Sequence, residues 1–380
     1  MPGKAYNPKL FEQEHDHHER FNGLPKEAID AYRSVSKEGR AKAGYPAKWT
    51  YDQLWEVRKA GRSGQVGHFI YEMFYDIYMG VEDEFVENSI DTQVRLYPDY
   101  VPRANDIIEY AIKASRAKMR AFISQDHFFP TVGQAWGAQQ WVDEMVRAGQ
   151  LEYACRCLGA HILAWSHHPD QINLISKYPN LGGILFWCQT YGGKNCGPDL
   201  RIYDEHGKLD SEVKEVVRLC AHYRIPVMSG HATMTYEHIL PLAQYASEVG
   251  AHLLWMHAAP WTAMEDRATI KQYKDLARLG CYMQVDANKV LPSIVWPMID
   301  PNQGLQWMVE VGPDHVIPCT DGGQPFFGDA LDCWRMFVRA MIHFGIKKED
   351  IKAMIQTNPA KFLYLDEQGY KQKAIESPVK

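Results

Sequence analysis

Short apolar runs alternate with helical patterns along most of the chain, and this alternation limits the folds that the chain can adopt. Eight runs have the length and composition of buried strands, at 85–96, 120–124, 160–164, 183–187, 225–229, 252–256, 281–285 and 316–319. Eight strands that alternate with helices are typical of a (β/α)8 barrel, whereas a doubly wound sheet would more often carry a glycine-rich phosphate loop after its first strand. No such loop is present, so we predict an α/β fold, a (β/α)8 TIM barrel.

Helical patterns fill the segments between the predicted strands. They cover 103–116, 134–148, 211–223, 236–249 and 267–279, and two more, 329–344 and 348–356, follow the last strand. Gly149, Gly250 and Gly280 come directly after three of these helices. Glycine is the common residue just past a helix end, so these positions support the predicted boundaries.

The pattern divides the chain into three parts. Residues 1–84 form a predicted N-terminal helical extension, with helices at 26–37, 50–58 and 68–78. Residues 85–365 form the predicted barrel, and residues 366–380 form a C-terminal tail. The apolar residues in 68–78 recur at helical spacing, so this helix should pack on the barrel or on another subunit.

Composition and charge exclude several classes of protein. The formal net charge of -6 argues against nucleic acid or an anionic membrane as the main partner. No apolar run is long enough to span a membrane, and the N-terminus lacks a signal region, so we expect a cytoplasmic protein. The eight cysteines form no Cys-x-x-Cys pair and should be small buried residues. The 11 Trp and 21 Tyr suggest a pocket or a subunit interface, and hence a homo-oligomer.

Ionisable residues follow several predicted strands at the point where each strand ends. They are His127, His231, His257 and, after the apolar run 316–319, Asp321. In a barrel the carboxyl ends of the strands carry the chemistry, and three imidazoles with a carboxylate are the material of a metal site or an acid–base site. A single histidine at a strand end is usually structural, but several together favour such a site. The run 286–289 ends the seventh strand and can add a polar contact.

These residues follow one another in an order that resembles the amidohydrolase superfamily. The matching positions are His127, Gly230-His231, His257, Thr320-Asp321-Gly322 and the closing Asn358-Pro359-Ala360. The strongest local match is Gln125-Asp126-His127-Phe128-Phe129-Pro130-Thr131, which is similar to the Lys-Ser-His-Phe-Phe-Pro-Thr second strand of an uncharacterised branch. The resemblance covers about 85–365 and implies a metal-dependent hydrolase on a TIM barrel.

The first predicted strand departs from that pattern. The superfamily has a His-x-His metal pair there, and this chain has Gln93 and Arg95 in its place, while Gln125 replaces the lysine of the second-strand motif. A guanidinium is always charged and cannot bind a cation. A two-metal site of the superfamily's usual kind is therefore not expected.

Two arrangements of the site remain open. In the first, which we prefer, one divalent metal is held by His127, His231 and His257, or by two of these with Asp321. Zinc is the expected metal, with manganese or iron as alternatives; Asp321 is the base or a ligand, and Arg95 binds a substrate carboxylate. In the second, no metal binds, and His231, His257 and Asp321 form an acid–base cluster with Arg95 as the anion anchor.

The expected partner is a small carboxylated or aromatic substrate. The residues predicted to contact it are Arg95, Gln93, Gln125 and, from a glycine-rich loop after the fourth strand, Lys194 and Asn195. The reaction implied is hydrolysis of an amide, a lactone or a cyclic C–N or C–O bond, with Asp321, His257 and Arg95 as catalytic residues. The alternatives are a metal-dependent non-oxidative decarboxylase on the same barrel and a non-catalytic subunit paired with an active paralogue.

Overall fold

The computed structural model describes ten segments of the chain. They are residues 82–99, 102–126, 130–163, 168–186, 202–204, 206–230, 234–259, 268–291, 301–325 and 328–366. The predicted helices at 26–37, 50–58 and 68–78 lie outside the described residues, as does the tail beyond residue 366. The domain boundaries predicted from the sequence therefore stay a prediction.

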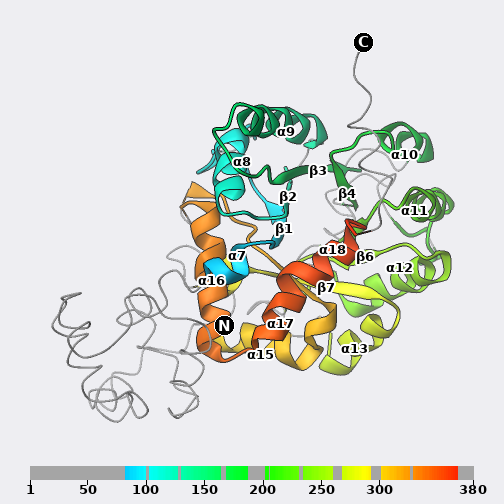
Figure 1. The fold of residues 1–380 in the computed structure, drawn as a ribbon. Helices are drawn as coiled ribbons and strands as arrows, with labels where there is room; N and C mark the ends of the chain where they lie inside the picture. Colours follow the sequence, from blue (N-terminus) through cyan, green and yellow to red (C-terminus); the bar gives the residue numbers. More distant parts are fainter. Residues whose placement is uncertain are drawn as a thin grey trace, which may run out of the picture. The chain divides into compact units, whose positions relative to one another are not determined.

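Eight parallel strands form the centre of the fold (Figure 1). They are β1 (Ile90–Val94), β2 (Ala121–Ser124), β3 (Arg156–Ile162), β4 (Leu181–Phe186), β5 (Val227–Ser229), β6 (Leu253–Trp255), β7 (Cys281–Asp286) and β8 (Val316–Cys319). Each strand pairs with the next one in the sequence. The ends of the sheet then meet, because Asp321 N donates to Gln93 O (2.9 Å) and Arg95 N donates to Gly322 O (2.8 Å). This order is that of a (β/α)8 TIM barrel, as predicted.

Helices alternate with the strands, and most of them lie around the outside of the ring that the strands make (Figure 1). They are α7 (Asp83–Val86), α8 (Ile107–Arg116), α9 (Val132–Arg147), α10 (Pro169–Ile175), α11 (Ser211–Tyr223), α12 (Tyr236–Val249), α13 (Ile270–Arg278), α14 (Ala287–Val290), α15 (Pro301–Val311), α16 (Ala330–Phe344), α17 (Lys348–Lys352) and α18 (Asn358–Phe362). A 3-10 turn η3 (Pro313–His315) precedes β8, and a π-helical turn η5 (Ala353–Thr357) joins α17 to α18. No helix among these is long and apolar enough to cross a membrane.

Several boundaries differ from the sequence prediction, and the helices α10 and α15 were not predicted. The predicted first strand 85–96 begins with the last residues of α7, whose first turn carries the acidic residues Asp83 and Glu84 that stabilise a helix start. Strand β3 begins at Arg156, four residues earlier than predicted, because Arg156 is only partly buried and interrupts the apolar pattern. The single helix predicted at 348–356 is instead α17 followed by η5.

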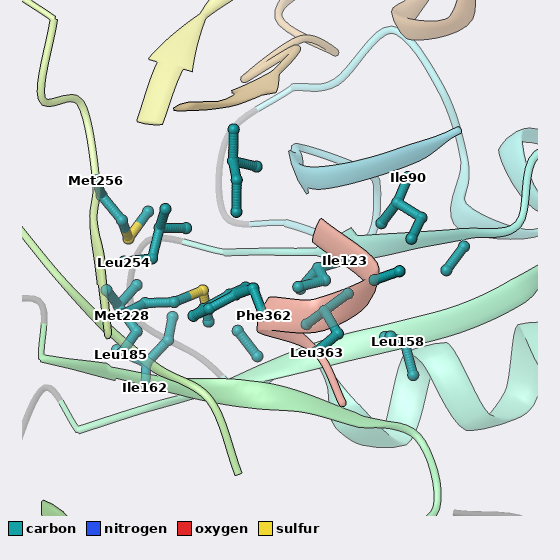
Figure 2. Packing of buried hydrophobic residues seen from close by; sticks show 14 residues of the cluster. Ile90, Ile123, Leu158, Ile162, Leu185, Met228, Leu254, Met256, Phe362 and Leu363 are labelled. Atoms are coloured by element: carbon teal, nitrogen blue, oxygen red, sulfur yellow. The ribbon is translucent and has the colours of Figure 1, made fainter. Parts of the chain in front are cut away.

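The amino-terminal end of the barrel is closed by α18 and filled with apolar side chains. Phe362 and Leu363 reach in among residues of several strands, including Ile123, Leu158 and Met228 (Figure 2). Asn358 fixes the helix in place, since its Nδ2 donates to the carbonyl of Val316 at the start of β8 (2.9 Å). The barrel interior at this end is therefore a packed core rather than a site.

The described cysteines match their predicted role. Six of them are buried as free thiols: Cys155, Cys157, Cys220, Cys281, Cys319 and Cys333. Burial raises the pKa of the Cys220 thiol, which keeps it neutral and unreactive.

Candidate active site

The Asp321 carboxylate lies at the carboxyl end of β8 and receives hydrogen bonds from four side chains. Its Oδ1 accepts from Gln93 Nε2 (2.8 Å) and Arg95 Nε (3.0 Å), and its Oδ2 accepts from Lys289 Nζ (2.7 Å) and Asn288 Nδ2 (3.0 Å). All five residues are buried. A carboxylate offers about four lone-pair sites, so every acceptor site of Asp321 is in use.

These contacts fix the charges of Asp321 and Lys289. Burial alone would raise the pKa of Asp321, but the charges on Lys289 and Arg95 outweigh it and hold the pKa well below its usual range. Burial likewise lowers the pKa of Lys289, and the negative charges of Asp321 and Asp286 more than reverse that effect and raise it. Asp321 is therefore anionic and Lys289 cationic at neutral pH, and Asp321 is a weak proton acceptor.

His257 and Asp286 form a buried pair beside this cluster. His257 Nδ1 lies 2.7 Å from Asp286 Oδ2, and Asp286 Oδ1 accepts from the thiol of Cys319 at 3.1 Å. Burial acts to raise the pKa of Asp286, but His257 and Lys289 outweigh it and lower the pKa. An ionised Asp286 favours the tautomer of His257 that carries its proton on Nδ1, which makes Nε2 the proton acceptor of the ring.

The backbone is strained just after β6 and β8. His257 has φ of 51° and Asp321 has φ of 42°, in the left-handed region that costs a non-glycine residue about 1–3 kcal/mol. The chain after Asp321 must turn sharply, and a Cβ on Gly323 would lie 1.8 Å from the carbonyl oxygen of Arg95. The second glycine of the Gly322-Gly323 pair is thus required for β8 to approach β1.

Asp91 lies within β1, is fully buried, and contacts Thr320, the residue before Asp321. Burial raises its pKa to about 7, although Thr320 and Gln93 donate hydrogen bonds to it. The Thr320 hydroxyl lies 2.6 Å from Asp91 Oδ2 and 3.1 Å from the carbonyl oxygen of Gln93. One hydroxyl proton can serve only one of these, so a protonated Asp91 that donates to Thr320 satisfies both contacts.

Buried acceptors without a hydrogen bond also occur at strand ends. Gln125 follows β2. Its Nε2 donates to the carbonyl of Thr92 on the neighbouring strand β1 (3.3 Å) and to Met228 Sδ on β5 (3.4 Å). The Oε1 atoms of Gln93 and Gln125 and the Oγ of Ser229 have no hydrogen-bond partner among the described residues. Buried polar atoms are normally paired, so these atoms can accept hydrogen bonds from a bound molecule or from water.

The structure brings together some of the predicted site residues. Gln93, Arg95, His257 and Asp321 lie in one cluster at the carboxyl ends of β1, β6 and β8. The predicted residues His127, His231, Lys194 and Asn195 lie outside the described residues. Their roles, and those of the clustered residues, stay predictions.

Sequence reasoning missed the residues that bind Asp321 and His257 from β7 and α14. Lys289 and Asn288 come from the four-residue helix α14, and Asp286 ends β7. One signal was present in the sequence: Asp286 and Lys289 stand three residues apart directly after a predicted strand, and the run 286–289 was predicted only to add a polar contact.

His257, Asp286 and Asp321 have the ligand atoms of a metal site. One atom from each lies within 4.8 Å of the others, so the three form a buried group that could hold a metal ion. The hydrogen bonds at Asp321 oppose this use. Both of its oxygens are filled by donors, and two of those donors, Arg95 and Lys289, carry positive charges. A metal bound through Asp321 therefore does not fit this arrangement of side chains.

A comparison with protein families gives one match, which spans residues 88–284 and so just over half of the chain. The matching family is described as a family of unknown function (DUF6282). The chain belongs to this family. The part that matches DUF6282 runs from the start of β1 into β7 and contains Gln93, Arg95 and His257, while Asp321 lies beyond it.

Comparison with the curated proteins finds no match for this DUF6282 protein. Among solved structures, a probable 2-pyrone-4,6-dicarboxylic acid hydrolase from Acinetobacter baumannii is 11% identical, with 73% of this chain and 99% of that chain covered and a TM-score of 0.47. An amidohydrolase from Pseudomonas aeruginosa is 10% identical (74% and 97% covered, TM-score 0.47). An amidohydrolase from Burkholderia multivorans with bound zinc is 10% identical (73% and 99% covered, TM-score 0.43). All three scores lie below 0.5, and the assignment of the barrel rests on its own strand order.

Proposed function

We propose that this protein is a hydrolase of the amidohydrolase type that cleaves a C–N or C–O bond in a small substrate. The active site is the cluster at the carboxyl ends of β1, β6, β7 and β8. One observation carries the proposal: a buried histidine, His257, is held by the carboxylate of Asp286 beside a second carboxylate, Asp321, that is fixed by two cations. Buried, perturbed ionisable groups at the mouth of a TM barrel's strands are typical of catalysis rather than of stability.

His257 is the proposed general base. Asp286 orients the ring and stabilises its protonated form, so that Nε2 can take a proton from the attacking water and return it to the leaving group. We assign this role to His257 rather than to Asp321, the base predicted from the sequence, because the lowered pKa of Asp321 makes it a poor proton acceptor. The Lys289 and Arg95 cations would stabilise negative charge that develops on the substrate oxygen.

Gln93 and Gln125 are the proposed substrate contacts. Their buried Oε1 atoms need a donor, which an amide N–H or a hydroxyl of the substrate can supply. Arg95 is the predicted anchor for a substrate carboxylate. Its Nε donates to Asp321 and its Nη1 to the carbonyl of Asp126, so a bidentate grip on a carboxylate would require one of these bonds to break.

The single divalent metal predicted from the sequence, with zinc first and manganese or iron as alternatives, stays a prediction. The buried group of His257, Asp286 and Asp321 supports it by ligand type. A metal there would polarise the bond to be cleaved, but it would also require Lys289 to leave Asp321. The roles given above to the residues of the chain do not depend on such an ion.

Decarboxylation is the second candidate reaction. The two cations Arg95 and Lys289 support this reaction, because they could hold the carboxylate of an acid substrate. His257 would deliver a proton to the carbon atom from which the carboxylate leaves as carbon dioxide. Product analysis separates the two reactions: hydrolysis adds water across the bond and releases no gas, whereas decarboxylation releases one carbon dioxide for each substrate molecule.

A substrate panel with active-site variants tests the proposal. Amides, lactones and cyclic imides, each with and without a carboxylate, are assayed with the wild type and with His257→Gln, Asp286→Asn and the control His222→Gln on the exposed face of α11. We expect hydrolysis by the wild type and the control, and a loss of about 10²–10⁴-fold in kcat/KM for both active-site variants. Full activity of His257→Gln would overturn the site, and no turnover by the wild type in any class would support the non-catalytic alternative.

A further inference from the structure

We propose that His257, Asp286 and Asp321 have the ligands of a divalent-metal site, and that the ammonium group of Lys289 takes the place of the metal ion. The wild-type protein then binds no metal at Asp321, and removal of Lys289 turns the group into a metal site. This inference concerns cation binding, and it holds whether or not the proposed hydrolase activity is correct.

All of the acceptor sites on Asp321 are occupied by hydrogen-bond donors. Lys289 Nζ and Asn288 Nδ2 donate to Oδ2 at 2.7 Å and 3.0 Å, while Gln93 and Arg95 donate to Oδ1. A metal ion bonds to an oxygen lone pair, and none is left on this carboxylate. Removal of the Lys289 side chain frees one site on Oδ2, the oxygen that does not contact Arg95.

The charges of the cluster also oppose the binding of a metal ion. Lys289 and Arg95 carry one positive charge each, and Asp321 and Asp286 carry one negative charge each, so the cluster is balanced when His257 is neutral. A divalent ion added to this cluster would lie beside two fixed cations in a site with little water, where charges interact strongly. Without the Lys289 charge, the cluster has a net charge of about −1 when His257 is neutral, and this negative charge attracts a cation.

Lys289 is a buried residue of a short helix. It belongs to α14, a helix of four residues that begins directly after Asp286 at the end of β7. This short helix brings the side-chain nitrogen to Asp321 Oδ2 at 2.7 Å, and Lys289 also donates to Asn288 Oδ1 at 2.9 Å. The lysine is thus buried and held on two sides, as a bound ion would be, rather than lying over the site from a surface loop.

Metal titration of matched variants tests the proposal. The wild type, Lys289→Met, Lys289→Gln and the control Lys274→Met, which removes an exposed lysine of α13, are stripped of metal and dialysed against zinc. Bound zinc is measured by elemental analysis, and the visible spectrum of the cobalt form reports the ligands. We expect Lys289→Met and Lys289→Gln to bind about one ion per chain at least about 100-fold more tightly than the wild type and the control.

A double variant locates the ion. Lys289→Met with Asp321→Asn removes the proposed ligand and should lose the gained affinity, whereas binding at a surface histidine would be unchanged. Circular dichroism and the melting temperature establish that each variant is folded. Lys289→Gln removes the charge, and its amide can turn its oxygen toward an ion, so this variant serves if Lys289→Met does not fold. The proposal is overturned if the wild type binds zinc as tightly as the folded Lys289 variants, or if those variants gain no affinity.

Neither outcome depends on enzyme activity, so the two proposals can fail separately. A wild type that binds no zinc and hydrolyses a substrate agrees with both. A wild type that binds zinc at Asp321 and hydrolyses a substrate contradicts this inference alone.

Discussion

Both ends of the barrel are buried, but one end is lined by apolar side chains and the other by charged side chains. At the amino-terminal end, α18 presses Phe362 and Leu363 into a cluster of apolar side chains (Figure 2). At the carboxyl end, Asp321, Lys289 and Arg95 are just as inaccessible to water but carry full charges. Apolar burial stabilises a fold directly, whereas a buried ion pair gains little net stability over a well-packed apolar group. The first end therefore stabilises the barrel, and the contrast supports our proposal that the second end carries the active site.

The largest expected effect comes from removal of the central anion. Asp321→Asn leaves Lys289 and Arg95 buried without their carboxylate, so we expect the free energy of unfolding to fall by about 3–5 kcal/mol and activity to be lost. Urea denaturation gives the stability. The double variant Asp321→Asn with Lys289→Met removes a cation as well and should be more stable than the single variant. Equal stabilities would mean that the two charges do not interact.

The apolar end should respond differently. Phe362→Ala removes a ring from the closed end of the barrel, and we expect a loss of about 3 kcal/mol in the free energy of unfolding. The folded fraction should keep its kcat/KM, because α18 packs at the end of the barrel where the strands begin, as the contact of Asn358 with Val316 shows. A fall in kcat/KM that matches the Asp321→Asn variant would show that the two ends are not separate in function.

The sequence was sufficient for the alternation of eight strands with helices. Apolar residues at helical spacing predicted α11 with its observed bounds, and Gly250 marked the observed end of α12. Strand order in a barrel also places His257 and Asp321 at one rim. These features depend on local patterns, which a sequence contains.

The pairing of charges could not be read from the sequence in the same way. Which donor fills which oxygen of Asp321 depends on the short turn of α14, which brings Lys289 across to β8. The same four residues could have pointed their side chains at solvent. The β1 segment was misread at its start for a related reason, because Phe85 and Val86 are apolar in a helix as well as in a strand.

A smaller effect is expected from Asp91, which connects β1 to Thr320 below the site. Its pKa in the folded protein is about 7, raised by burial from the usual 3.8, so the folded state keeps this proton over a range in which the unfolded state has lost it. Stability should therefore fall as the pH rises through that range, by about 2 kcal/mol between pH 5 and pH 7. Above the folded pKa this contribution is fully lost.

Asp91→Asn isolates this contribution. The amide mimics the protonated acid, because its Nδ2 can donate to Thr320 while its Oδ1 accepts from the backbone. Denaturation curves at several pH values should show a gain in stability over the wild type that grows from pH 5 to pH 7. A constant difference between the two proteins would show that Asp91 does not titrate there.

In the arrangement that we propose, Lys289 and not a metal ion neutralises Asp321. The most direct measurement is a crystal structure of the wild type grown in excess zinc, with anomalous data collected at the zinc absorption edge. We expect no anomalous peak at the barrel mouth next to Asp321 and clear density for Lys289 Nζ at hydrogen-bonding distance from its Oδ2. An anomalous peak about 2.0–2.2 Å from an Asp321 oxygen, with Lys289 displaced, would contradict the account.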